Sequence, residues 1–194
     1  MAYYKYRNFN NIEYFFDIIS NKRLYCSLAS ELNDPFEWYF KSDYILSLEE
    51  QEKINNYKKR SYICSLSRTF ANNVMWAMYA DEHRGCCIEI ELESPNDIEI
   101  VKVQYQQGIH FAEKSESIKD IIQYKTSEWS YEEEERVLKK SVERPYVKVK
   151  ITRVLLGLKV SNADVWEKII HAFDPEIKVR RITMEEIENK KLNS

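Results

Sequence analysis

The segment that follows Gly85 constrains the fold more than any other part of the chain, because its side chains alternate strictly in character. Three apolar side chains, Ile88, Ile90 and Leu92, alternate with glutamates at positions 89, 91 and 93. This period of two predicts a strand with one buried face and one face in water. A half-buried strand is typical of an antiparallel or mixed sheet rather than of a buried parallel sheet.

The other segments predict short strands and helices that follow one another without an internal repeat or a linker. Strands are expected over Tyr3–Arg7, Leu24–Ser27, Tyr62–Ser67, Ile98–Tyr105, Val137–Lys139, Tyr146–Ile151, Val154–Leu158 and Ile177–Ile182. Helices are expected over Ile12–Ile19, from the capping box at Ser47 to Arg60, after Asn72, over Ser115–Tyr124 and over Ser161–Phe173. The strand from Ile98 is expected to form a hairpin with the alternating strand across the turn at Pro95–Asp97.

These elements predict a single α+β domain over residues 1–194, with a mixed, largely antiparallel sheet and flanking helices. The residues after about 184 form a charged tail. With 44% apolar residues the chain is long enough to bury one core.

Glycine and charge exclude several function classes. Gly85, Gly108 and Gly157 are the 3 glycines of the sequence, and no two are close enough for a glycine-rich phosphate loop. The chain therefore has neither the dinucleotide fingerprint nor a P-loop. Its 29 Lys and Arg residues against 32 Asp and Glu residues give a net charge of -3, so no global basic field attracts nucleic acid or an anionic membrane.

The cysteines and the N-terminal segment bear on the compartment. No pair of cysteines has the two-residue gap of a zinc knuckle or a thioredoxin-like motif, so reduced core thiols are expected. The 4 cysteines are Cys26, Cys64, Cys86 and Cys87. A charge at Lys5 comes too early for a secretory signal, and the apolar run Val74–Ala80 is too short to cross a bilayer. We therefore expect a cytoplasmic protein with no membrane partner.

Several segments are unusually dense in aromatic, acidic and amide side chains. They are Tyr4–Arg7, Asn33–Glu37, Met75–Ala80 followed by His83–Gly85, and Trp129–Arg136. In this order and spacing they resemble the bacterial family called domain of unknown function 2971, whose members are often found near phage-defence genes. The resemblance runs from Tyr4 to Arg136, about two thirds of the chain. Met78 stands where the family has a histidine, which argues against a mechanism that needs an imidazole there.

A second resemblance rests on three short motifs in chain order. Arg7, then Ser65-Leu66-Ser67, then Glu132-Glu133-Glu134 are similar to the arginine-serine-glutamate class of ADP-ribosyltransferases. That class binds NAD with a glycine-poor, split-sheet α+β fold, so the resemblance implies NAD as substrate and no metal. It further implies an acceptor that is a protein or a nucleic acid, and an effector role in defence or in a toxin–antitoxin pair with an antitoxin or other defence-locus partner.

The chemistry of NAD cleavage gives each motif residue a role. The planar guanidinium of Arg7 suits the pyrophosphate, and the Ser65 hydroxyl can orient the ribose. Cleavage of the nicotinamide–ribose bond passes through an oxocarbenium-like state, which a carboxylate at the ribose hydroxyl stabilises. By resemblance that carboxylate is Glu134, and Glu132, expected to point the same way on a strand, would activate the acceptor.

Further residues complete the expected site. Trp129 and Tyr131 could stack on nicotinamide or adenine. The expected cofactor-binding residues are Arg7, Ser65, Ser67, Tyr131 and Trp129, and the expected substrate pocket contains Asp34, Glu37, Trp76 and Tyr79.

Each of these features also has a structural interpretation. The run Glu132–Glu135 suits a solvated stretch at the start of a helix. Arg7 could cover the core with its aliphatic stem, and the helical spacing of Met75, Trp76 and Tyr79 suits a core face. Asn33–Asp34 before a proline suits a turn.

Two other function classes stay open. One is a metal-dependent nuclease or phosphohydrolase that uses Asp34, Glu37 or Asp81 together with Glu132–Glu135, because hard cations bind carboxylate oxygens. The other is a non-catalytic binding module, such as an antitoxin or a sensor in a defence locus. A metal held by His83, Cys86 and Cys87 is not expected, because adjacent cysteines on a strand face opposite ways.

Overall fold

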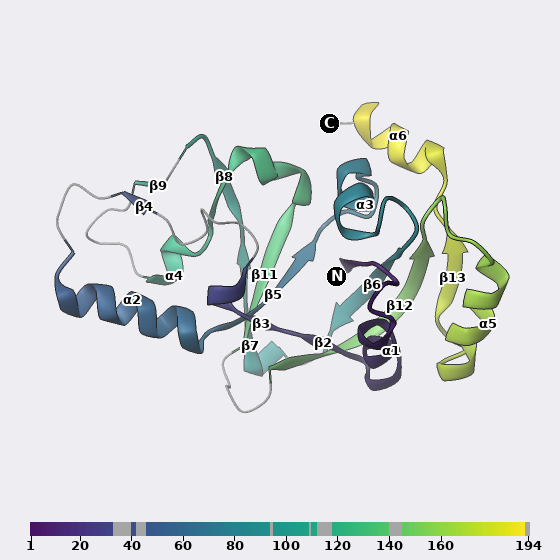
Figure 1. Ribbon diagram of the computed structural model, residues 1–194, viewed down its shortest axis with the longest axis horizontal. Coiled ribbons are helices and arrows are strands. Elements are labelled where there is room, and N and C mark those ends of the chain that lie inside the picture. Colours follow the sequence, from purple (N-terminus) through teal and green to yellow (C-terminus); the bar gives the residue numbers. More distant parts are fainter. Residues whose placement is uncertain are drawn as a thin grey trace. The chain divides into compact units, whose positions relative to one another are not determined.

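The computed structural model describes residues 1–32, 40–41, 46–93, 95–108, 110–111, 118–139 and 145–192. The chain divides into two compact units. Unit 1 comprises Met1–Leu24, Leu66–Ser94 and Val147–Ser194, and unit 2 comprises Tyr25–Ser65 and Pro95–Tyr146. Both units combine helices with strands, and most of the strand pairs of the described residues are antiparallel, which confirms the predicted α+β class with a mixed, largely antiparallel sheet (Figure 1).

Unit 1 is built around strand β6 (Cys86–Leu92), the alternating segment of the sequence. On one edge β6 pairs antiparallel with β1 (Tyr3–Arg7), and on the other it pairs antiparallel with β12 (Tyr146–Leu156). Next, β12 pairs in parallel with β13 (Lys178–Arg181). The apolar face of β6 is fully buried at Ile88 and Ile90, which confirms the interpretation of the alternation.

The helices of unit 1 are α1 (Ile12–Asn21), α3 (Asn73–Tyr79), α5 (Ala163–Phe173) and α6 (Met184–Leu192). Helix α1 buries its apolar face at Phe15, Ile18 and Ile19. The N-cap of α3 is Asn72, whose side chain accepts hydrogen bonds from the backbone N–H groups of Val74 and Met75. A short strand, β2 (Arg23–Tyr25), pairs with β12.

Unit 2 contains the first four residues of β5 (Tyr62–Ser67), with β3 (Ser27–Leu28) and β11 (Glu134–Lys139) as neighbours. Strand β11 pairs antiparallel with β7 (Ile98–Lys102). The last residue of β5, Ser67, belongs to unit 1, where it lies opposite Tyr4 of β1.

Short elements complete unit 2. Two parallel pairs are β8 (Gln104–Gln106) with β10 (Tyr124–Thr126), and β4 (Phe40–Lys41) with β9 (His110–Phe111). The helices are α2 (Leu48–Arg60), α4 (Ile118–Ile121) and the 3-10 turns η1 (Ala29–Glu31), η2 (Pro95–Asp97) and η3 (Ser127–Glu132). The predicted capping box of α2 is confirmed, because Ser47 and Glu50 bond reciprocally at its start.

The structure corrects three predicted elements. The predicted hairpin is wrong, since β7 pairs with β11 while both edges of β6 are taken by β1 and β12. The two strands expected over residues 146–158 are one strand with an irregularity between Ile151 and Arg153. The helix expected up to Tyr124 ends earlier, because α4 ends at Ile121 and Tyr124 begins a strand.

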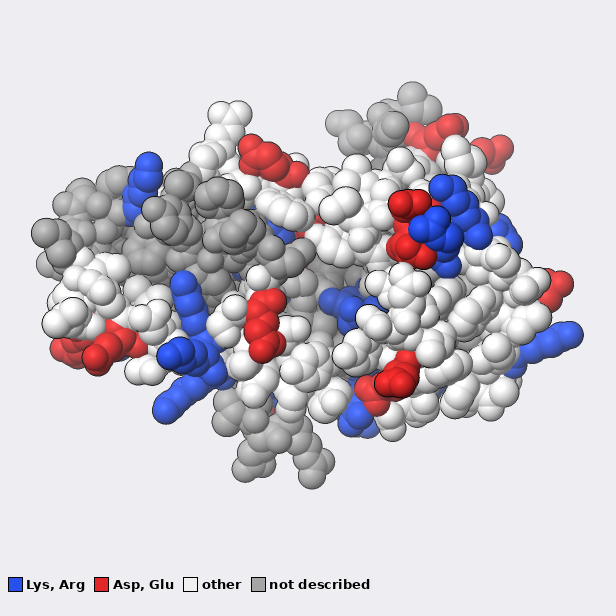
Figure 2. Space-filling view, in the orientation of Figure 1, with Lys and Arg blue, Asp and Glu red and all other residues white. Residues whose placement is uncertain are grey.

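Most of the buried side chains of both units are apolar, and the four cysteines are among the buried residues. Cys26, Cys64, Cys86 and Cys87 are buried and form no disulfide with one another, as predicted for core thiols. On the visible face, basic and acidic side chains are interspersed, without a broad field of one sign (Figure 2). Within the described ranges, no helix is both long and apolar enough to cross a membrane.

Candidate functional site

Four ionisable side chains of unit 2 are buried together, and they include both glutamates proposed from sequence. Lys125, Glu132 and Glu134 are 6%, 6% and 4% exposed, and Arg136 is 1% exposed. We call these four residues the charge cluster. Two carboxylates and two cations give the charge cluster no formal net charge, which is the condition under which such groups tolerate burial.

Lys125, on β10, joins the two carboxylates. Its Nζ lies 2.7 Å from Glu132 Oε2 and 3.3 Å from Glu134 Oε2. The same Nζ lies 4.6 Å from the centre of the Trp129 ring, within range of a cation–π interaction. The ammonium group is thus bounded by two anions and one aromatic face.

Arg136, on β11, holds Glu134 from the other direction. Its Nε donates to Glu134 Oε1 over 3.0 Å and its Nη2 donates to Glu134 Oε2 over 3.2 Å. Its Nη1 donates to the backbone oxygen of Ile122 over 2.7 Å. A bidentate pair of this kind fixes the plane of the carboxylate.

The backbone at Glu133 brings both carboxylates to the same ammonium. Glu132 ends the 3-10 turn η3, Glu133 adopts a left-handed conformation with φ 45°, and Glu134 begins β11. The prediction that Glu132 lies on the strand is therefore wrong, although its side chain still converges with that of Glu134 on Lys125. The interpretation of the run as a solvated stretch is also wrong for Glu132 and Glu134, while Glu133 is exposed.

The environment of Glu134 favours its ionised form. Burial by itself raises the pKa of Glu134, but the charges of Arg136 and Lys125 and the hydrogen bonds from Arg136 and Ser65 lower it to about 2. The carboxylate is therefore ionised at neutral pH. In this state it can stabilise positive charge on a neighbouring group, and it does not serve as a general acid.

Two further groups contact Glu134. The Ser65 hydroxyl, on β5, hydrogen-bonds to the carboxylate, so the structure brings together the serine and glutamate that the second resemblance paired. The phenol oxygen of Tyr105 accepts the backbone N–H of Glu134 over 2.8 Å. Burial raises the pKa of Tyr105, so this phenol keeps its proton at neutral pH.

Trp129 and Tyr131 both lie on η3, next to the charge cluster. Both are half-buried, and their ring centres are 6.1 Å apart. The Trp129 ring packs against the Lys125 ammonium, which in turn pairs with Glu134.

The other predicted site residues belong to unit 1 or lie outside the described residues. Arg7 is half-buried at the end of β1, where it pairs with Cys86. Ser67 is 3% exposed, and its hydroxyl bonds to the backbone of Thr69, which closes a turn. The predicted pocket residues Asp34 and Glu37 fall outside the described ranges.

The structure supports the core interpretation for the aromatic face of α3. Trp76 is fully buried, and its Nε1 donates to the backbone oxygen of Phe70 over 2.7 Å, so its ring offers no free face to a substrate. Tyr79 is half-buried. Trp76, one of the residues of the predicted substrate pocket, thus lies in the core of unit 1.

The described residues contain no group of three or more His, Cys, Asp or Glu side chains placed to hold a metal ion. Asp81, which the nuclease alternative would use, forms a bidentate contact with Arg84, with both oxygens 3.0 Å from guanidinium nitrogens. In the charge cluster, the Lys125 ammonium lies between the two carboxylates, at the position that a metal ion bound by both would take.

Sequence reasoning did not single out Lys125, Arg136 or Tyr105. A signal existed for Arg136, because the period of two along Glu134, Arg136 and Leu138 places all three on the buried face of β11. Lys125 had no such signal, since its partners come from η3 and β11 and the sequence does not specify how those elements pack.

No protein-family model matches this chain, and no curated protein or solved structure matches it either. The resemblance to domain of unknown function 2971 and the resemblance to ADP-ribosyltransferases therefore stay predictions.

Proposed function

We propose that this protein cleaves the nicotinamide–ribose bond of NAD and transfers the ADP-ribose group to an acceptor. One observation carries the proposal: the Ser65 hydroxyl bonds to the ionised carboxylate of Glu134, with Glu132 next to it. A serine that orients ribose and a glutamate that faces the developing charge must be neighbours for this chemistry, and in unit 2 they are neighbours.

In the proposed reaction the bond between ribose C1′ and the pyridinium nitrogen breaks, and its electron pair leaves with nicotinamide. The ionised Glu134 stabilises the positive charge that develops on the ribose. An oxygen or nitrogen nucleophile of the acceptor then bonds to C1′, and Glu132 takes its proton. Tyr131 is proposed to stack on the nicotinamide.

The burial of Glu134 adds a condition to the proposal. With 4% of Glu134 exposed, the ribose hydroxyl would reach the carboxylate only after neighbouring side chains have moved away. Arg136 would stay in place as the cation that keeps Glu134 ionised, since Arg136 is also bonded to the backbone of Ile122.

The test is release of nicotinamide from NAD by the purified protein, with and without a bacterial lysate as the source of acceptor. We expect release by the wild type and its loss in Glu134→Gln, which keeps the shape of the side chain and removes its charge. Glu133→Gln is the matched control, because Glu133 is the exposed neighbour and carries the same substitution. Circular dichroism verifies that each variant is folded. Ser65→Ala is a second, less disruptive variant, because it removes only the hydrogen bond between Ser65 and Glu134.

One observation favours a second candidate, the non-catalytic binding module of a defence locus. Both carboxylates of the charge cluster are already bonded to cations of the same chain, an arrangement that a purely structural role explains equally well. In that case the wild type releases no nicotinamide under either condition, and a phage-plating or toxicity assay is unaffected by Arg7→Ala. A protein that is toxic only without its defence-locus partner would instead support the effector role.

A further inference from the structure

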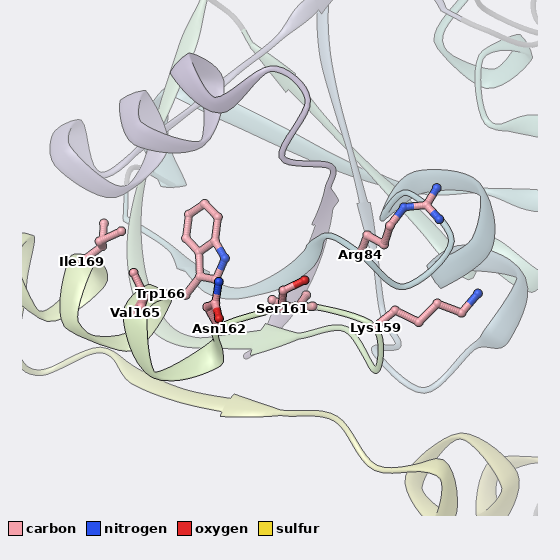
Figure 3. A pocket seen from close by; sticks show the side chains of 8 residues that line it. Arg84, Lys159, Ser161, Asn162, Val165, Trp166 and Ile169 are labelled. Atoms are coloured by element: carbon pink, nitrogen blue, oxygen red, sulfur yellow. The ribbon is translucent and has the colours of Figure 1, made fainter.

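Unit 1 contains a cavity of about 360 Å³ at the start of α5, and none of the charge-cluster residues lines it (Figure 3). Its volume lies within the range of small-molecule sites, which begins near 300 Å³. The lining residues are Arg84, Lys159, Val160, Ser161, Asn162, Val165, Trp166 and Ile169.

One wall of the cavity is apolar and rigid. In Figure 3 the side chains of Trp166, Val165 and Ile169 come from α5 on one side. The Trp166 ring stacks on Phe9 with centres 4.0 Å apart and meets the edge of Phe15 at 5.8 Å. Because two aromatic neighbours hold the indole, it presents a fixed surface to whatever fills the cavity.

The opposite end of the cavity carries two basic side chains (Figure 3). Arg84 is bonded to Asp81 and Glu82 through three of its five N–H groups, which fixes the guanidinium and leaves two donors. The backbone of Lys159 is anchored by its N–H donating to the His83 oxygen over 3.0 Å, and its side chain is exposed. Among the described residues no carboxylate forms an ion pair with Lys159.

The turn that carries Arg84 is strained. Asp81, Glu82 and His83 have φ values of 49°, 51° and 71°, so three consecutive residues adopt left-handed conformations. This conformation costs about 1–2 kcal/mol per residue for L-amino acids. Such strain persists where surrounding contacts enforce it, and it collects at ligand sites.

We infer that this cavity binds a small molecule that combines a planar ring with a phosphate group, the chemistry of a mononucleotide. The ring would lie against the wall formed by Trp166, Val165 and Ile169, and the phosphate would contact Lys159 and the two remaining donors of Arg84. The Ser161 hydroxyl and the side chain of Asn162, which makes no capping bond to α5, add polar groups along the cavity. The inference does not rest on the proposed function.

Calorimetric titration with AMP, adenosine and inorganic phosphate tests the inference. We expect AMP to bind more tightly than either fragment, because only AMP contacts both ends of the cavity. Lys159→Ala should weaken AMP binding about tenfold, the loss of one charge-assisted hydrogen bond. Lys168→Ala is the matched control, since Lys168, on α5, is an exposed lysine like Lys159 but does not line the cavity.

A second readout assigns the site. AMP should quench tryptophan fluorescence in the wild type, and Trp166→Phe, which keeps an aromatic ring against Phe9, should remove that quenching. The inference is overturned if millimolar AMP gives no signal, if adenosine or phosphate alone binds as well as AMP, or if Lys168→Ala weakens binding as much as Lys159→Ala does.

Discussion

Arg136 and Glu134 lie two residues apart on β11 and form a bidentate ion pair in which both side chains are almost completely buried, at 1% and 4% exposure. Adjacent positions of a strand face opposite ways, so the spacing of two is what allows the pair to form on a single buried face. The pair ties the stability of unit 2 to the same carboxylate that the proposed reaction uses.

Arg136→Met should destabilise the protein by about 3–5 kcal/mol, because it leaves the Glu134 carboxylate buried with one fewer cation. Urea unfolding followed by circular dichroism measures the change. Glu133→Gln, at an exposed neighbour, should change the free energy of unfolding by less than about 0.5 kcal/mol. Equal effects of the two substitutions would contradict the burial of the pair.

The stability of the wild type should fall as the pH is lowered from about 4.5 toward 2. Burial raises the pKa of Glu134, yet Arg136 and Lys125 hold it at about 2, below its value in the unfolded chain. A group with a lowered pKa in the folded state contributes stability above its unfolded pKa and loses it as the pH falls through the folded value. The difference in unfolding free energy between wild type and Glu134→Gln should therefore be larger at pH 6 than at pH 3, and a constant difference would refute this.

Gly157→Ala should destabilise unit 1 by about 3 kcal/mol, the upper end of the cost of overpacking. A Cβ atom at this position would lie 2.2 Å from the backbone oxygen of His83, and backbone cannot move aside as a flexible side chain can. At Gly108 no atom of the described residues lies within 4 Å of the position that a Cβ would take. The φ of 72° opposes a side chain there, so Gly108→Ala should cost about 1 kcal/mol. Thermal unfolding of both variants measures the two losses of stability. A larger loss of stability in Gly108→Ala than in Gly157→Ala would contradict the prediction.

The charge of Lys159 should be detectable at His83. Burial lowers the pKa of His83, and the nearby positive charge of Lys159 lowers it further. Lys159→Ala should therefore raise the pKa of His83, while Lys168→Ala should leave it unchanged. An NMR titration of the imidazole resonances measures the pKa of His83 in both variants. An unchanged pKa of His83 in Lys159→Ala would contradict the proximity of the Lys159 ammonium to His83.

Local sequence patterns predicted the helices and strands well, but they predicted poorly which strands pair with each other. The alternation around Ile88 and the capping box at Ser47 are properties of neighbouring residues, so the sequence contains them directly. The strand that pairs with β7 is decided by packing between distant segments, and there the hairpin prediction failed. The same holds for the charge cluster. The sequence predicted that Glu132 and Glu134 act together, but the ion pairs of Lys125 depend on how distant segments pack.

The four buried cysteines allow the opening of each unit to be measured separately. Cys26 and Cys64 belong to unit 2, and Cys86 and Cys87 to unit 1, and none is more than 1% exposed. Burial raises the pKa of Cys86 and Cys87, so these two thiols are also poor nucleophiles while they stay buried. A thiol-modifying reagent would thus label each pair only when its own unit opens. Peptide mapping of the labelled cysteines would give two separate opening rates from a single sample without any introduced probe.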